Sequence, residues 1–446
     1  MASVLQAKLT EGSVSRHLYV MAAPMVWGLL ATMSFNAVDT FFVAQLGDLQ
    51  LAAMSFTFPV AMLLMSVAIG LGAGTSSAVA RAVGAGDHVL AKRLATDSMS
   101  LTALISVVVS LVGWLSIDLV FGLLGATPEL MPYIHEYMDV WYLSAPFLMV
   151  PMVTFASLRA MGWSQVQGYL MGAAAIFNAL LDPLLIFGLY GFPRLELQGA
   201  ALATLVTRAI TLWVAFHILK NRTHMLTNPL APWLTLKRSW MMIFVVGIPA
   251  MFTNVVIPLS GGVVVALVAQ HGTAAVAGLG VALRVEPLAL IVFYALSGVV
   301  GPFFGQNMGA GKIQRLYEAL KVLALFNMGF GLFLALLLWF MTPLLAGMFS
   351  DSDEVISIAA HYMALVPISY GTYGIVMAVN AAFNGLGRPS PPMMISFLRV
   401  LGLYLPLAWL GQYYMGLSGL FAATACANLL LGILAYFWLK RHLNGM

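Results

Sequence analysis

The chain has 446 residues, of which 61% are hydrophobic and only 8% are charged, and its formal net charge is +4. Soluble domains carry about 25% charged residues, so this composition excludes an ordinary soluble protein and indicates an integral membrane protein. The positive charge is not gathered into a basic run with interleaved aromatics, so nucleic acid is not an expected partner.

Twelve apolar runs are long enough to cross a bilayer as helices, because one span needs about 20 residues. The first run is too long for the core of a signal peptide, so we expect it to remain as a span. The sequence therefore predicts an all-α polytopic protein with twelve transmembrane helices. In chain order they cover residues 18–45, 51–82, 94–123, 131–157, 166–190, 198–220, 239–269, 276–307, 313–348, 355–382, 392–411 and 418–439.

Basic residues give the direction of these spans. An even number of spans puts both termini on one side, and most lysines and arginines fall in the segments of that side. The loops of the opposite side contain only Arg194 as a basic residue. By the positive-inside rule, we expect both termini in the cytoplasm. We expect the protein to be a multi-pass protein of a bacterial or archaeal cytoplasmic membrane.

The two halves of the sequence repeat each other at an offset of 225 residues. VAQLG at 43–47 corresponds to VAQHG at 268–272, and Pro24 corresponds to Pro249. Six spans in each half make the repeat parallel, with a pseudo-two-fold axis along the membrane normal. We therefore predict two six-helix bundles. They would cover residues 1–220 and 239–446, with a cytoplasmic linker at 221–238.

Two pseudo-equivalent bundles are the architecture of an alternating-access transporter. The segment GAGK at 309–312 lacks the spacing of a nucleotide-binding P-loop, so the energy must come from an ion gradient or from a partner protein. The single cysteine, Cys426, and the scattered histidines predict no metal site. A nucleophile–base arrangement is also missing, so we expect a secondary transporter without a cofactor, and not an enzyme.

Two acids break the symmetry of the repeat. Asp39 lies in the apolar run FNAVDTFFVAQLG (35–47) and corresponds to Val264. Asp182 lies in NALLDPLLI, and its counterpart region in the second half has no acid. An ionisable residue at the bilayer centre costs roughly 2.5–3.5 kcal/mol on insertion scales, and it usually marks function. Helix rise places both acids at a similar depth, so they share one site if their helices are adjacent.

The neighbours of these acids favour a proton or cation site. Asn178 lies one turn before Asp182 on the same face and is placed to hydrogen-bond it. Pro183 and Pro24 each free a carbonyl one turn back in their helices. Two carboxyls held close in a low dielectric cannot both ionise cheaply, which favours a shared proton. The alternative is that each acid is neutralised by a structural partner.

Other buried charges are weaker candidates. Asp139 is predicted to reach the depth of the two acids. Arg284 and Glu286 are two residues apart and so do not face each other, which favours pairing with a neighbouring helix over ligand binding. For Arg208 and Arg399, snorkelling or counter-ion roles are favoured.

The chain resembles the multidrug and toxic compound extrusion (MATE) family, and within it the DinF-like branch. The resemblance rests on the repeat together with three motifs, which are NAVDTFFVAQLG, NALLDP and GQNMGAGK at 305–312. It implies functional roles for Asp39, for the Asn178 and Asp182 pair, and for a threonine of the sixth helix, here Thr204. The acids that the NorM-like branch uses on helices 7 and 10 are not found, so a second-half cation site is not expected.

The resemblance implies export of amphipathic, often cationic drugs or dyes in exchange for protons, with sodium as the second choice. It also implies that protonation bends the first helix near Pro24 and displaces the drug. We expect a monomer whose partners are these small molecules and the lipid bilayer. The alternative function is a lipid-linked saccharide flippase of the same superfamily. That function would need several basic residues in the cavity, where only Arg208, Arg284 and Arg399 qualify.

Overall fold

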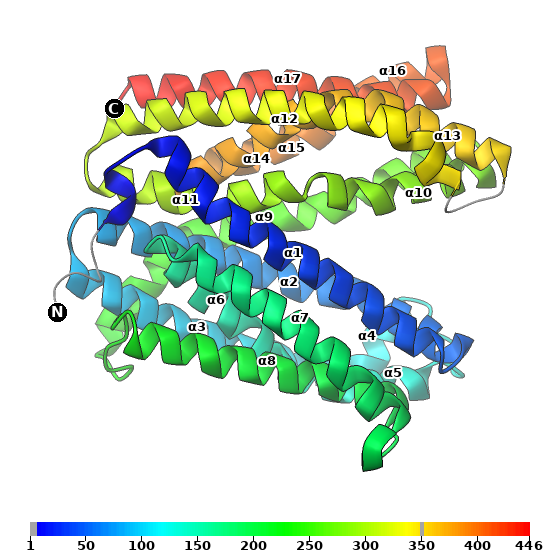
Figure 1. Ribbon diagram of the computed structural model, residues 1–446, viewed down its shortest axis with the longest axis horizontal. Coiled ribbons are helices and arrows are strands. Elements are labelled where there is room, and N and C mark those ends of the chain that lie inside the picture. Colours follow the sequence, from blue (N-terminus) through cyan, green and yellow to red (C-terminus); the bar gives the residue numbers. More distant parts are fainter. Residues whose placement is uncertain (1–6, 348–351) are drawn as a thin grey trace. The chain divides into compact units, whose positions relative to one another are not determined.

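The computed structural model describes residues 7–347 and 352–446, and the regular elements among them are helices (Figure 1). Three short 3-10 turns are η1 (Lys8–Thr10), η2 (Leu189–Gly191) and η3 (Val366–Ser369), and η4 (Leu398–Tyr404) is a π-helix. The α-helices are α1 (Val14–Ala44), α2 (Asp48–Gly84), α3 (His88–Leu115), α4 (Ile117–Leu123), α5 (Met131–Leu143), α6 (Ala145–Ala160), α7 (Ser164–Phe187), α8 (Glu196–Asn221), α9 (Trp233–Ala269), α10 (Thr273–Ala289), α11 (Ile291–Gly309), α12 (Ile313–Gly347), α13 (Asp353–Leu365), α14 (Tyr370–Gly385), α15 (Ser390–Phe397), α16 (Leu405–Met415) and α17 (Leu417–Asn444).

Ten helical stretches of the described chain are long and apolar enough to cross a membrane. Two further pairs, α5 with α6 and α10 with α11, pass the same criterion together but are bent by 41° and 45°. Counting each bent pair as one span gives the twelve spans that the sequence predicts. The all-α polytopic fold is therefore confirmed.

The two bent pairs correct the prediction of continuous helices at 131–157 and 276–307. The first breaks at Ser144 and the second at Leu290. Pro146 follows the first break and Pro287 precedes the second, and a proline lacks the N–H that a continuous helix needs. The expected run 94–123 likewise divides, at Ser116 between α3 and α4. Residue 348, the expected end of another span, lies outside the described residues.

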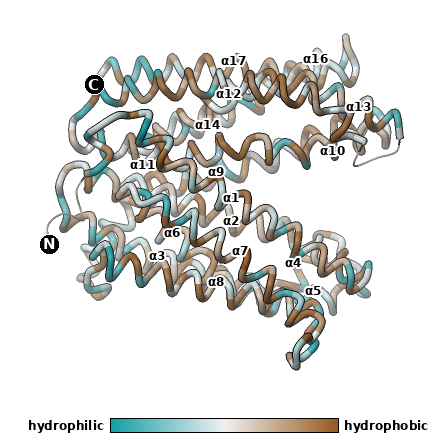
Figure 2. The backbone as a smooth tube through the Cα atoms, viewed as in Figure 1, coloured by the Kyte–Doolittle hydropathy of each residue, from teal (hydrophilic) through white to brown (hydrophobic). Residues whose placement is uncertain are grey.

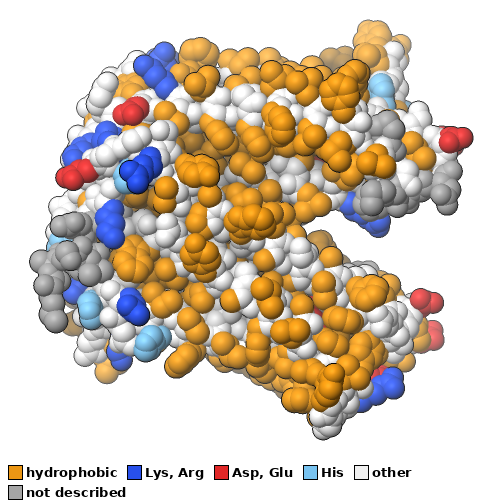
Figure 3. Space-filling view, viewed as in Figure 1, with side chains coloured by type: hydrophobic (Ala, Val, Ile, Leu, Met, Phe, Trp, Pro, Cys, Tyr) orange, Lys and Arg blue, Asp and Glu red, His pale blue; other side chains and the backbone are white. Residues whose placement is uncertain are grey.

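Apolar side chains cover the flanks of the helices, and charged side chains gather near the helix ends (Figure 3). The tube coloured by hydropathy shows the same distribution along each helix (Figure 2). Large residues such as Trp27, Trp213 and Phe340 are more than half exposed. Such exposure is costly in water but not against lipid tails, because the tails are apolar like these side chains. The helices also satisfy their own backbone hydrogen bonds, as a bilayer requires. The surface is that of a membrane-embedded protein.

The chain divides into two compact units. The first contains the described residues 7 and 8 with Ala23–Met251, and the second contains Leu9–Ala22 with Phe252–Met446. The beginning of α1 therefore belongs to the second unit, and the beginning of α9 belongs to the first. Division of the chain into bundles at 220 and 239 stays a prediction.

In the first unit, α6 lies in the centre and packs against α2, α3 and α8, while α7 and α5 also pack against α8. The beginning of α9 approaches α2 closely, because a Cβ on Gly247 would lie 3.3 Å from the carbonyl oxygen of Gly70. A buried apolar cluster that includes Phe121, Ile134 and Ile186 closes one end of this unit. This packing fixes α5, α7 and α8 around the cavity described below.

In the second unit, α14 lies between α11, α12 and α17. The GQNMGAGK motif ends α11 with a tight turn, in which Gly311 has a φ of +68°. Four side chains at this turn hold the segment that precedes α1. Gln306 accepts from the Leu9 N–H (3.1 Å), Asn307 donates to the Leu9 carbonyl (3.1 Å), Lys312 to the Thr10 carbonyl (2.9 Å) and Arg315 to the Gly12 carbonyl (2.8 Å).

Candidate functional site

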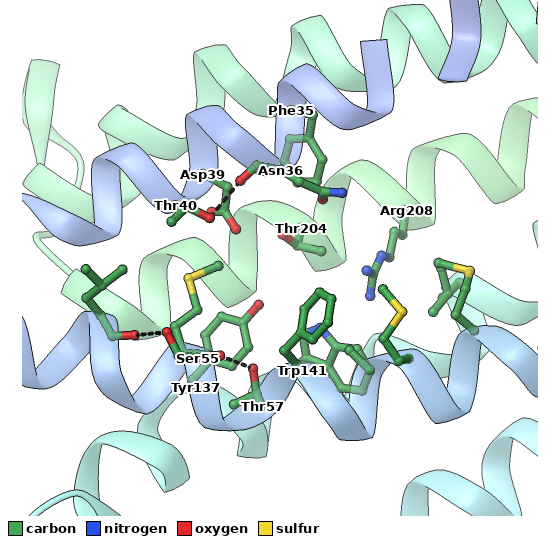
Figure 4. A pocket seen from close by; sticks show the side chains of 17 residues that line it. Phe35, Asn36, Asp39, Thr40, Ser55, Thr57, Tyr137, Trp141, Thr204 and Arg208 are labelled. Carbon is green, nitrogen blue, oxygen red and sulfur yellow. Dashed lines mark hydrogen bonds between the residues drawn. The ribbon is translucent and has the colours of Figure 1, made fainter. Parts of the chain in front are cut away.

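Asp39 lies on α1 and faces a cavity of about 490 Å³ in the first unit (Figure 4). The side chain is only 4% exposed. Among the described residues, its Oδ1 atom has no hydrogen-bond partner. The cavity is lined by Phe35, Asn36, Asp39 and Thr40 of α1, by Leu51, Met54, Ser55, Thr57, Phe58, Ala61, Met62 and Met65 of α2, and by Tyr137, Trp141, Leu148, Thr204 and Arg208 of α5, α6 and α8.

The hydroxyl groups of this cavity are held by their own helices. Thr40 donates to the carbonyl of Asn36 (2.8 Å), and Thr57 donates to the carbonyl of Met54 (2.7 Å). Ser55 makes the same bond one turn back in α2. Back-bonding of this kind uses the hydroxyl hydrogen and leaves oxygen lone pairs for other partners. The wall therefore offers acceptors beside Asp39.

Asn178 and Asp182 form a buried pair on α7. Asn178 donates from Nδ2 to Oδ1 of Asp182 over 2.7 Å, and the two side chains are 1% and 0% exposed. This confirms the hydrogen bond expected from their spacing. Within the described chain, Asp182 Oδ2 and Asn178 Oδ1 have no partner. Asp182 also lies close enough to Asp39 for the two charges to interact.

An apolar compartment of about 180 Å³ adjoins the cavity that contains Asp39. Asn178 and Thr204 lie in its wall, and Asp182 is hydrogen-bonded to Asn178, so the structure brings the predicted residues Asp39, Asn178, Asp182 and Thr204 into one region. Methionine side chains are flexible and polarisable, which suits binding of ligands of different shapes. Five residues line both spaces, namely Phe35, Met65, Leu148, Thr204 and Arg208, and the apolar compartment adds among others Phe147, Met152, Phe155 and Met171.

Arg208 was expected to snorkel or to act as a counter-ion, and the structure places it in the wall of the cavity. It lies near the middle of α8, and its side chain points into the cavity (Figure 4). Its Nη1 donates to Ser144 Oγ over 2.7 Å, and its guanidinium lies 5.6 Å from the centre of the Trp141 ring. The available signal was its distance from both ends of α8, about 18 Å by helix rise, which is too far for snorkelling.

Pro24 lies inside α1, which remains one helix across it. At this level α1 touches α7, because a Cβ on Gly168 would collide with the carbonyl of Pro24. A Cβ on Gly28 would in turn lie 3.0 Å from the Cα of Gly168. The proline therefore sits against the helix that carries Asn178 and Asp182.

Asp139 lies outside this cavity. It accepts a hydrogen bond from Trp114 Nε1 (2.9 Å) and lies 3.6 Å from Nδ1 of His135. It lines a different pocket, together with Trp114 and Tyr142. The structure therefore places Asp139 apart from Asp39.

The second unit holds another cavity, of about 210 Å³, where Glu286 accepts a hydrogen bond from the Tyr362 hydroxyl over 2.8 Å. This partner on α13 agrees with the expected pairing of Glu286 with a neighbouring helix. Arg399 lies 4.9 Å from the centre of the Tyr373 ring in the same wall. Arg284 is exposed and does not line this cavity. No group of three metal-ligating side chains occurs in the described parts of the chain.

Membrane-spanning helices around a cavity with buried acids define a polytopic membrane transporter. The MatE family model matches residues 24–184 and again 249–410, so the chain belongs to the multidrug and toxic compound extrusion family. The two matches begin 225 residues apart, which is the offset of the sequence repeat. Members of this family are transporters, and the chain is therefore a transporter and not an enzyme.

Similar proteins support the same assignment. The chain is 38% identical over 433 residues to the FAD transporter of Shewanella oneidensis, covering 97% of this chain and 96% of that one. It is 26% identical to the probable multidrug resistance protein YoeA of Bacillus subtilis, over 98% and 97% of the two chains. Among solved structures, the Vibrio cholerae MATE transporter VcmN in the bent form has a TM-score of 0.92. It is 31% identical, and the match covers 97% of each chain.

Proposed function

We propose that the chain is a secondary active exporter that exchanges amphipathic or cationic drugs and dyes for protons by alternating access. It would act as a monomer in a bacterial or archaeal cytoplasmic membrane, with both termini in the cytoplasm. The observation that carries the proposal is the position of Asp39. Its carboxyl is buried, has an oxygen without a partner among the described residues, and faces a cavity large enough for a drug-sized molecule.

Exchange follows when a proton and a cationic substrate compete for one carboxyl. Ionised Asp39 attracts a cation strongly, because the surrounding dielectric is low. A proton on Asp39 removes that attraction and releases the substrate. Asp182 interacts electrostatically with Asp39, and the hydrogen bond from Asn178 holds the Asp182 side chain in place. Two ligands that exclude each other are coupled negatively, which is the thermodynamic requirement for antiport.

A proton suits the site better than sodium. A hard metal cation takes several oxygen ligands at once, whereas one unpartnered carboxylate oxygen is enough for a proton. The charge of the wall also argues against a lipid-linked saccharide flippase. Among the described residues that line the cavity, Arg208 is the one basic side chain, and a pyrophosphate would call for several.

Flavin nucleotides are a second candidate substrate class. The relative that is 38% identical over almost the whole chain is a FAD transporter. The cavity offers the aromatic rings of Tyr137 and Trp141 beside Arg208, which are groups that suit a planar ring and an anion.

Transport in proteoliposomes tests the exchange. An imposed proton gradient should drive accumulation of a cationic dye such as ethidium, and a sodium gradient of the same size should not. Asp39→Asn keeps the shape of the side chain but cannot carry the exchanged proton. We expect this variant to reduce gradient-driven transport to the level of empty liposomes. Asp118→Asn is the control, because Asp118 is 82% exposed at a helix end.

Full proton-driven transport by Asp39→Asn would remove Asp39 from the coupling mechanism. Transport driven by sodium alone would overturn the choice of ion. Equal losses in Asp39→Asn and Asp118→Asn would show that the assay reports expression or folding.

A further inference from the structure

Arg208 is a charged residue in the middle of a membrane-spanning helix without an acidic partner at bonding distance. In the part of the chain that the structure describes, its one hydrogen bond goes to the neutral hydroxyl of Ser144. The ion pairs found there do not include Arg208 and Asp39. A guanidinium stays charged and has five N–H donors, so most of its donors are free to bind a ligand.

The guanidinium is also held in position. Ser144 lies at the break between α5 and α6, and its hydroxyl donates to the Trp141 carbonyl over 2.7 Å. The same oxygen accepts from Nη1 of Arg208, and the Trp141 ring lies beneath the guanidinium. Ser144 is fully buried, so this support is rigid. Fixed donors lose less entropy on binding than free ones, and this arrangement is typical of a binding site.

The residues around Arg208 indicate the chemical class of such a ligand. Arg208 lines both the cavity that contains Asp39 and the apolar compartment beside it. Asp39 and Arg208 face the cavity from its two ends, with Thr204 between them (Figure 4). The apolar compartment offers Phe155 and Met171 to an aromatic or aliphatic body. An anion at Arg208 can therefore keep its apolar part within reach of this compartment.

We propose that Arg208 is a specificity-determining residue that binds the phosphate or carboxylate of an anionic, aromatic substrate, whose apolar body lies in the adjoining compartment. The proposal rests on the proposed function, since it assigns a substrate class to the same transport cavity. It extends that function from cations, which Asp39 attracts, to anions. A guanidinium binds a carboxylate or phosphate through two parallel hydrogen bonds, and such charge-assisted bonds are about twice as strong as neutral ones.

Two pairs of ligands test this assignment. Flavin mononucleotide and riboflavin share the flavin ring and differ by a phosphate, and pyrenebutyrate and pyrenebutanol differ by a carboxylate. Binding is measured with the purified protein in phosphatidylcholine nanodiscs, without any gradient. The wild type should bind the anionic member of each pair at least about tenfold more tightly.

Arg208→Gln should remove most of this preference and leave the affinity for riboflavin and pyrenebutanol within about threefold. Arg208→Lys keeps the charge and should retain part of the preference for the anionic ligand. This result would separate charge recognition from a folding defect. Arg399→Gln is the matched control, because it removes an arginine that lines the cavity of the second unit. We expect this control to keep the preference of the wild type.

An unchanged preference in Arg208→Gln, or equal binding within each pair by the wild type, would overturn the proposal. Competition by added phosphatidylglycerol but not by flavin mononucleotide would assign Arg208 to a lipid head group and also overturn it. These outcomes are independent of the proposed function, which is tested by gradient-driven dye transport. Intact exchange of ethidium with no anion preference would reject the anion site alone.

Discussion

At the scale of single residues, the site is marked by buried polar atoms without partners. Asp39 Oδ1, Asp182 Oδ2 and Asn178 Oδ1 are three such atoms within the described chain. Buried polar groups are almost always hydrogen-bonded, because leaving one unpaired costs about 1–3 kcal/mol. The three atoms belong to the predicted site residues, and each can accept a hydrogen bond from a proton-bearing group.

The bond from Asn178 to Asp182 should contribute measurably to stability. Asn178→Ala removes the donor and leaves Oδ1 of a fully buried carboxyl without its partner. We expect a loss of about 1–3 kcal/mol, seen as a lower apparent melting temperature of the purified protein. Asn36→Ala is the control, because Asn36 is an exposed cavity residue whose side chain does not bond Asp182. Equal melting temperatures for the two variants would contradict this reading.

Local spacing explains which site residues could be predicted. Asn178 and Asp182 lie one helical turn apart, so their hydrogen bond could be predicted from the sequence alone, and the structure confirms it. Their role in coupling stays a prediction. The contacts of Arg208 could not be predicted from local spacing. Its partners Ser144 and Trp141 lie more than 60 positions earlier in the sequence, and the packing of α5 and α6 against α8 brings them to it.

At the scale of elements, hydropathy predicted where helices lie but not where they bend. A straight span and a span broken at Ser144 have the same hydropathy, and Pro146, which follows the break, is a local signal that hydropathy does not record. Ser144, at this bend, and Trp141, just before it, are the residues that contact Arg208. The close approach of α1 and α7 could not be predicted from hydropathy either, because it depends on which glycines face each other, namely Gly28 and Gly168.

The contact at Gly168 should control how α1 moves near Pro24. Gly168→Ala places a methyl group against the Pro24 carbonyl, and neither backbone can yield without separating the helices. We expect a lower melting temperature and at least a severalfold loss of dye transport. Gly172→Ala is the matched control, because it lies one turn further along α7 and its Cβ would meet nothing within 4 Å. Similar behaviour of the two variants would show that the glycine contact is unimportant.

At the scale of the whole molecule, the chain is a duplicated transporter whose halves have diverged in charge. The family matches begin at residues 24 and 249, and the acid Asp39 stands where the second half has Val264. The repeat could be detected in the sequence, because comparing the two halves requires no structural information. The role of GQNMGAGK could not be predicted from the sequence, because Asn307 of the motif and Arg315, three residues after it, bind backbone groups about 300 positions away in the chain.

The segment before α1 is therefore fastened to the second unit, although most of α1 belongs to the first. Arg315 donates to the carbonyls of Leu9 and Gly12 and to Oδ1 of Asn307. Arg315→Ala removes these bonds. Because charge-assisted hydrogen bonds contribute about 1.5–3 kcal/mol each, amide hydrogen exchange in the peptide covering residues 7–16 should be at least about tenfold faster.

Lys321→Ala provides the comparison for this experiment, since Lys321 is an exposed cation further along α12. It changes the net charge in the same way but leaves the bonds to the segment before α1 intact. Exchange in residues 7–16 should then match the wild type, and exchange elsewhere in α1 should be the same in both variants. If Arg315→Ala also left exchange unchanged, the anchoring of α1 would not depend on Arg315, and the burial of Leu9, which is 2% exposed, and the bond from Lys312 to Thr10 would be sufficient for it.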